Sequence, residues 1–155
     1  MRNRGFTFIE IMIVMVIIGV IASFGIPRIR DAVIKTNIRS ARVGFSLLAV
    51  TARQAAVARG CKSALHITTG TSGTVWVTVC KLTATGNVGT AVDTIGQVTA
   101  LASRYGVSIA STVDSIQYDP RGISIGYTQA IVRFTASGTS AKDSAIVNAI
   151  GKVTH

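Results

Sequence analysis

The hydrophobic residues of this chain follow three different patterns along its length. Residues 6–26 are apolar almost without interruption, and only Thr7, Glu10 and Ser23 are polar among them. At a rise of about 1.5 Å per residue, a helix over this segment spans roughly 30 Å, the thickness of one hydrocarbon core. The first pattern therefore predicts a single membrane-spanning helix, because no later apolar run is long enough to span again.

The second pattern lies between residues 28 and 60, where apolar residues recur at helical spacing. These residues are Ile29, Val33, Ile34, Ile38, Val43, Phe45, Leu47, Leu48 and Val50. The amphipathic spacing predicts that the helix continues and that this half packs on a globular body. Pro27 removes a backbone donor and Gly25 loosens the same place, so we expect a helix break there, either a kink or a short non-helical stretch. Gly60 is the expected cap, just beyond Arg59.

The third pattern begins after Gly60 and consists of short alternating stretches between Gly, Ser and Thr. The stretches SALHITT and TVWVTVCKL predict two strands that GTSG joins as a hairpin. The stretch SIQYDPRGISIGYTQAIVRFTA predicts strand, turn, strand, turn, strand, and SAIVNAIGKVTH predicts a last hairpin. Residues 83–97 are glycine-rich and without period, which predicts a loop. The expected fold class is α+β, a long N-terminal helix packed on an antiparallel β-sheet body over residues 61–155.

Charge adds an orientation to this picture. The formal net charge is +10, from 16 Lys and Arg against six Asp and Glu. Arg2 and Arg4 precede the apolar segment, which marks the cytoplasmic side of a membrane helix and places the rest of the chain outside the cytoplasm. Eight of the bases lie between Arg28 and Lys62, where they can meet lipid phosphates, and a nucleic-acid partner is the alternative.

Two cysteines lie in the exported part, and export permits a disulfide between them. An even count fits one bond between Cys61 and Cys80, and two buried free thiols are the alternative. Two cysteines and the distant His66 and His155 make a poor zinc set, so no metal site or cofactor is expected. The chain has no nucleophile elbow, phosphate-binding loop or zinc-protease motif, and we expect no catalytic residue and no enzyme.

The beginning of the chain resembles the class III leader of type IV pilins and type II secretion pseudopilins. The resemblance rests on RGFTFIE, that is, a short basic leader ending in Gly5, then Phe6, then Glu10 at the fifth position counted from Phe6. An unbroken apolar helix follows, and Pro27 falls where pilins usually carry a helix break. The resemblance implies a leader over residues 1–5, a transmembrane and assembly helix over 6–27, and its amphipathic continuation over 28–60.

The resemblance also implies how this segment is used. A prepilin peptidase in the membrane would cut between Gly5 and Phe6, and the new amine of Phe6 would be methylated. That amine keeps its positive charge, and Glu10 of a neighbouring subunit would be its counter-ion in the apolar core of a fibre, where an unpaired carboxylate is costly. The alternative is that the Glu10 carboxylate reaches back to the lipid headgroups.

The body resembles the globular domain of the GspH/FimT pseudopilins. The resemblance rests on IQYDPRGISIG, AIVRFTA and VNAIGKV. It implies a minor pilin or pseudopilin of a type IV pilus or a type II secretion system, with other pilins, the prepilin peptidase and the bacterial inner membrane as partners. The globular domain would be periplasmic, and the fibre periplasmic or extracellular. The excess of positive charge favours the pilus.

A DNA-binding minor pilin of the FimT branch is the alternative function. Members of that branch that bind DNA carry a Gly-Arg-x-Arg motif near the C-terminus, whereas this chain has Gly151 and Lys152 followed by Val and Thr, with one base instead of two. Arg121, Arg133 and Lys152 are the candidate contacts with DNA phosphates. A third hypothesis is a lone membrane-anchored periplasmic protein whose leader-like start has no processing role.

Overall fold

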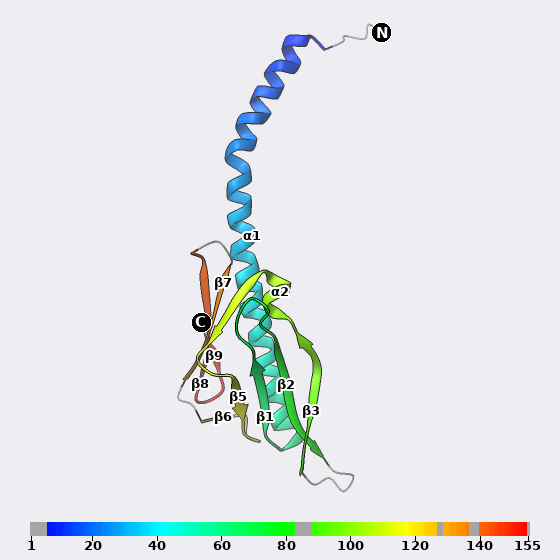
Figure 1. Cartoon of the computed structure of the whole chain (residues 1–155), viewed down its shortest axis with the longest axis vertical. Helices are drawn as coiled ribbons and strands as arrows, with labels where there is room; N and C mark the ends of the chain where they lie inside the picture. The colour runs from blue at the N-terminus through cyan, green and yellow to red at the C-terminus, as the bar shows by residue number, and fades with distance from the viewer. Residues whose placement is uncertain (1–5, 83–87, 127–128, 137–139, 155) are drawn as a thin grey trace. The chain divides into compact units, whose positions relative to one another are not determined.

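The computed structural model describes residues 6–82, 88–126, 129–136 and 140–154. It divides into two compact units, Met1–Lys35 and Thr36–His155. The first unit is helical from Phe8 onward, and the second contains the remainder of the same helix together with the strands of the described residues (Figure 1).

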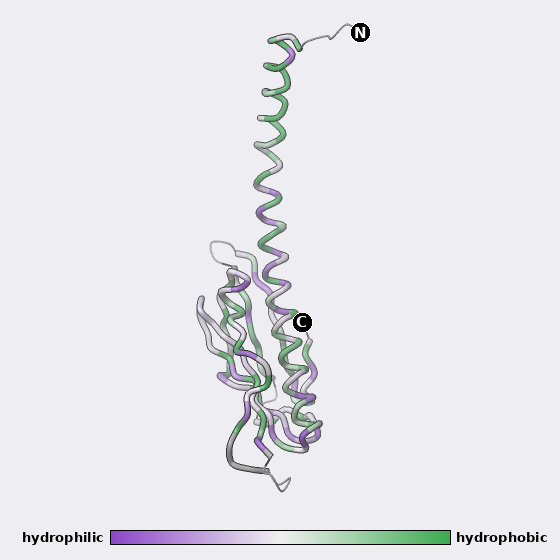
Figure 2. The backbone as a smooth tube through the Cα atoms, turned by 90° about the vertical axis from the view of Figure 1, so that its right-hand side faces the viewer, coloured by the Kyte–Doolittle hydropathy of each residue, from purple (hydrophilic) through white to green (hydrophobic). Residues whose placement is uncertain are grey.

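Helix α1 runs from Phe8 to Arg59, and its helical assignment continues through Pro27. Of the two expected forms of the helix break at Pro27, the non-helical stretch is therefore wrong, and the kink stays a prediction. Pro27 cannot donate to the carbonyl of Ser23, but the loss of one hydrogen bond does not end a helix of this length. The N-terminal part of α1 consists mostly of hydrophobic residues, and hydrophilic residues are interspersed in the part that follows (Figure 2).

The end of α1 confirms the predicted cap. Gly60 adopts a φ of 62°, the left-handed conformation that glycine reaches without strain. Its N–H donates to the carbonyl of Val57 at 3.3 Å, and the N–H of Cys61 donates to the carbonyl of Ala56 at 3.2 Å. These two bonds make a Schellman motif and satisfy two of the free carbonyls at the helix end.

The C-terminal half of α1 has a buried face made mainly of small residues. Its buried members are Ile38, Ala41, Phe45, Ala49, Ala52, Ala55 and Ala56. The sequence predicted packing of this half, which is confirmed, but Val43, Leu47 and Val50 of the predicted apolar stripe are exposed. Alanines bring the helix backbone close to the strands, as the 2.6 Å bond from the Ser63 hydroxyl to the carbonyl of Ala52 shows.

The first sheet is antiparallel and has the strand order β3-β2-β1-β5-β6. Its strands are β1 (Ser63–Ile67), β2 (Val75–Leu82), β3 (Val88–Thr99), β5 (Ser115–Tyr118) and β6 (Ser124–Ile125). The predicted β1–β2 hairpin is confirmed, with Leu65 opposite Val77. The loop predicted over residues 83–97 is wrong from residue 88 onward, because β3 pairs with β2 along this stretch.

The second sheet has the order β4-β7-β8-β9 and is also antiparallel. Its strands are β4 (Val107–Ser111), β7 (Gln129–Ala136), β8 (Lys142–Asn148) and β9 (Val153–Thr154). The predicted strands after residue 115 and the last hairpin are confirmed, whereas β4 and the short helix α2 (Leu101–Tyr105) were not predicted. The rings of Phe45 and Phe134 pack with centroids 5.9 Å apart, which joins this sheet to α1.

Candidate functional site

The N-terminal end of α1 holds the polar residues on which the sequence prediction depends. Thr7 precedes the helix and Glu10 lies in its first turn. The N–H of Glu10 donates to the Thr7 hydroxyl at 3.3 Å, and the N–H of Thr7 donates to the Glu10 carboxylate at 3.4 Å. This reciprocal pair is a capping box, which satisfies two backbone donors that a helix start otherwise leaves free.

The capping box gives Glu10 a local role that the sequence interpretation missed. The signal was present, since Thr7 and Glu10 have the spacing of a Thr-x-x-Glu box before an apolar run. A carboxylate in the first turn also interacts favourably with the positive end of the helix dipole. Within a single chain, the carboxylate of Glu10 therefore already has a partner.

The apolar side chains around Glu10 are exposed in the part of the chain that the structure describes. Phe6 and Phe8 are exposed at 79% and 82%, and large apolar side chains up to Ile29 are exposed as well. In the part of the chain that the structure describes, α1 is the one helix that is long and apolar enough to cross a membrane. Gly5, the other residue of the predicted cleavage site, lies outside the described residues.

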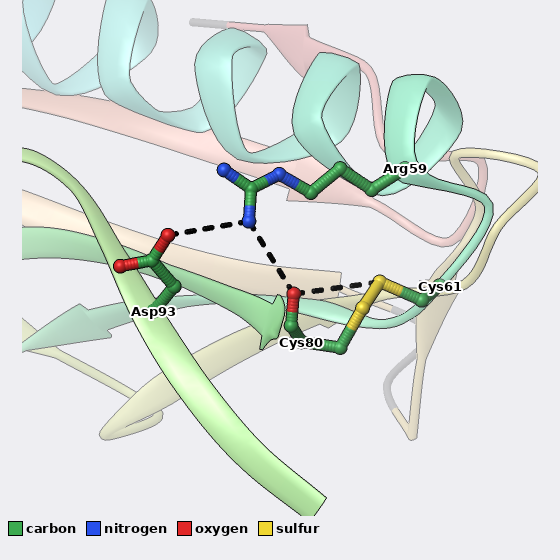
Figure 3. A network of polar contacts seen from close by, with 4 residues as sticks. All are labelled: Arg59, Cys61, Cys80 and Asp93. Carbon is green, nitrogen blue, oxygen red and sulfur yellow. Dashed lines mark hydrogen bonds and ion pairs between the residues drawn. A yellow bond between two sulfur atoms is a disulfide. The ribbon is translucent and has the colours of Figure 1, made fainter. Parts of the chain in front are cut away.

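The two cysteines form the predicted disulfide, which ties the end of α1 to β2. Cys61 and Cys80 are bonded, with their Cα atoms 6.2 Å apart. One guanidinium nitrogen of Arg59 donates to the carbonyl of Cys80 at 3.5 Å and lies 3.3 Å from a carboxylate oxygen of Asp93 on β3 (Figure 3). In the chain-entropy model, closing a loop of about 20 residues stabilises the folded state by roughly 3 kcal/mol.

Gly151 has a packing role, because two turns meet there. A Cβ atom on Gly151 would lie 2.7 Å from the carbonyl oxygen of Gly122 and 3.1 Å from the ring of Tyr118. Tyr118 is fully buried, and burial raises the pKa of its phenol to about 12, against a smaller opposing effect of the positive charge of Arg53. An unfolded tyrosine ionises near pH 10, so the free energy of unfolding should fall as pH rises from about 10 to about 12.

Gly151→Ala should lower the free energy of unfolding by about 3 kcal/mol, from the left-handed backbone and the contact with Gly122 together. Gly126→Ala is the matched control, because Gly126 also has a positive φ, 88°, but has no atom within 4 Å of the added methyl group. That control should cost about 1 kcal/mol. Urea unfolding followed by the fluorescence of Trp76 measures both, and equal losses would contradict the packing role.

The three candidate DNA contacts do not form one cluster. Arg121 and Lys152 are exposed and lie next to the touching glycines Gly122 and Gly151. Arg133 is exposed on β7 opposite Ser144, four residues from the strand end at Gln129, which is roughly 13 Å along a strand. This placement gives the DNA hypothesis no support beyond charge.

Potential metal ligands are dispersed over the described part of the chain. Within residues 6–82, 88–126, 129–136 and 140–154, no three His, Cys, Asp or Glu side chains lie together as a metal site would require. His66 stacks on Trp76 with ring centroids 5.0 Å apart, and its Nε2 lies 2.9 Å from the hydroxyl of Thr78. His66 on β1 therefore contacts side chains of the neighbouring strand β2.

Comparisons with known proteins agree with this geometry. Residues 1–26 match the family described as the prokaryotic N-terminal methylation motif. No curated protein sequence matches the chain. The type IV minor pilin FimU of Pseudomonas aeruginosa is structurally similar, with a TM-score of 0.56 at 11% identity over 77% of this chain and 87% of FimU.

A second crystal form of FimU gives the same result, with a TM-score of 0.51 at 10% identity over 75% of this chain and 90% of FimU. The predicted fold class is thus confirmed as the type IV pilin fold. The chain combines this fold with an N-terminal methylation motif.

Proposed function

We propose that the chain is a structural subunit, a minor pilin or pseudopilin, of a fibre that assembles through its apolar N-terminal helix. One observation carries the proposal, namely that the large apolar side chains from Phe6 to Ile26 are exposed on every side of the helix and that one carboxylate, Glu10, lies at the helix start. A membrane or the helices of other subunits must cover this surface, because exposing it to water is unfavourable.

The processing steps follow from the leader. A prepilin peptidase cuts after Gly5, and the amine of Phe6 is then methylated, so that a positive charge stands at the start of the mature helix. Before assembly, the chain is anchored in the bacterial inner membrane with residues 36–155 on the periplasmic side, as Arg2 and Arg4 on the cytoplasmic flank favour. The net charge of +10 favours a type IV pilus over a secretion pseudopilus.

The mass of the mature chain tests this function directly. Co-expression with a prepilin peptidase should give a chain that begins at Phe6 and carries one additional methyl group. Gly5→Val should leave the chain at full length, because a branched side chain next to the scissile bond obstructs the peptidase. A wild-type chain that still begins at Met1 in the presence of active peptidase would contradict the proposal. It would favour the alternative, a membrane-anchored periplasmic protein without a role in a fibre.

A further inference from the structure

The C-terminal half of α1 has a second face, which points away from its buried alanines. We call this face the outer strip, and it consists of Arg39, Val43, Leu47, Val50, Arg53, Gln54 and Val57. Successive helical residues turn by about 100°, which places most of these positions nearly opposite Ala41, Phe45 and Ala52. Arg53 lies at one edge of the strip, beside Gly122. Leu47 is exposed at 66% and Val43 at 57%, so the strip presents large apolar side chains between two arginines.

Two shallow grooves border the outer strip. The first, of about 350 Å³, is lined by Val50, Arg53, Gln54, Val57 and Ala58. The second, of about 290 Å³, includes Leu47 of the strip together with Leu101, Arg104 and Tyr105 of α2. Each groove has an apolar lining with a single arginine and no carboxylate. Recesses of this kind accept the side chains of a helix packed along the strip.

The arginines of this surface have no acidic partner among the described residues. The ion pairs of the described residues join Arg42 to Asp143 and Arg59 to Asp93. Neither of these arginines belongs to the outer strip. Asp119 accepts hydrogen bonds from the backbone N–H groups of its own turn. Arg39, Arg53 and Arg104 are exposed, and the guanidinium of Arg104 lies 5.8 Å from the ring centroid of Tyr105.

We infer that the outer strip binds an apolar helix that carries carboxylates and belongs to a different protein, not to a second copy of this chain. The inference rests on the proposed function, which requires helix-to-helix contact with other subunits. Charge decides the partner, because two outer strips facing each other would bring only bases together, and each chain has a net charge of +10. Apolar contact supplies affinity, and the arginines select the acidic helix.

The test uses the full chain in nanodiscs of uncharged lipid and a fluorescent probe. The probe is a synthetic helical peptide with a leucine stripe flanked by glutamates, and its counterpart has lysines in place of the glutamates. Anisotropy should show binding of the glutamate peptide and little binding of the lysine peptide. Arg39→Glu with Arg53→Glu should weaken binding of the glutamate peptide by roughly tenfold or more and should allow the lysine peptide to bind.

The matched control is Lys81→Glu with Arg133→Glu, which changes the net charge by the same amount at exposed positions on β2 and β7. Binding should stay within about twofold of wild type in this control. If both double variants lost the same affinity for the glutamate peptide, binding would depend on the net charge of the chain and not on the outer strip. If wild type bound both peptides equally, the arginines would not select an acidic helix. Self-association of the full chain at low salt would assign the strip to a second copy. Binding to anionic vesicles that depends on Arg39 and Arg53, without binding of the peptide, would assign it to a membrane.

These outcomes are independent of the mass measurement that tests the proposed function. A chain processed after Gly5 that fails to bind the glutamate peptide remains a fibre subunit, and only the acidic partner is refuted. A chain that binds the peptide at the outer strip but keeps Met1 retains the interface and loses the role in a processed fibre.

Discussion

Glu10→Ala is expected to lower incorporation into surface fibres by roughly tenfold or more, while cleavage after Gly5 continues. The reason is that, in the proposed fibre, the methylated amine of Phe6 would carry a positive charge into an apolar core, where an unpaired buried charge costs several kcal/mol. The sequence analysis explains this effect by the lost ion pair between the Phe6 amine and Glu10 of a neighbouring subunit. The capping box with Thr7 adds a second explanation, because alanine also removes the carboxylate that accepts the Thr7 N–H.

Two further variants separate these explanations. Glu10→Gln keeps an oxygen that can complete the capping box but removes the charge. Thr7→Ala breaks the box from the other side and keeps the carboxylate. If charge pairing drives assembly, Glu10→Gln should fail like Glu10→Ala and Thr7→Ala should assemble. The opposite result would make Glu10 a helix cap. Sheared surface fractions measure incorporation, and the size of the cellular chain reports cleavage.

Phe45→Ala is expected to lower the free energy of unfolding by about 4 kcal/mol. Phe45 is fully buried and packs on the ring of Phe134, so truncation removes a large apolar contact and leaves a cavity between α1 and the second sheet. The exposed Leu47, two residues further on the same helix, is the control, and Leu47→Ala should change stability by less than about 0.5 kcal/mol.

Urea unfolding of the full chain in a mild detergent, followed by the fluorescence of the single tryptophan, measures both variants. Comparable losses for Phe45→Ala and Leu47→Ala would show that both faces of α1 contribute to the core. That result would contradict the two-faced helix and would also remove the outer strip as a free surface.

The helix and the hairpins could be predicted because their signals are local. The unbroken apolar run after Phe6, the glycine after Arg59 and the alternation around Trp76 each specify an element by themselves. The disulfide followed from compartment and cysteine count. The capping box of Thr7 and Glu10 was equally local, and it was missed because the carboxylate was assigned to a neighbouring subunit or to the lipid headgroups and not to its own helix start.

The remaining features depend on tertiary context. Strand β3 contains Gly89 and Gly96 and has little alternation, and its pairing with β2 makes it a strand. Gly96 has a φ of 72°, and the register slips between Val75 and Val77, so an irregular strand is accommodated there. The choice of buried face on α1 was decided by how closely alanines such as Ala41 and Ala52 approach the sheets, which hydrophobicity does not encode.

The bond between Cys61 and Cys80 has a mechanical consequence. Tension applied to the N-terminal end of α1 travels along the helix to Arg59, and Cys61 follows two residues later. The covalent link passes this load directly to β2, which lies between β1 and β3 in its sheet. Three hydrogen-bonded strands then resist the pull together, so the body should withstand forces along its helix that would peel a single terminal strand away.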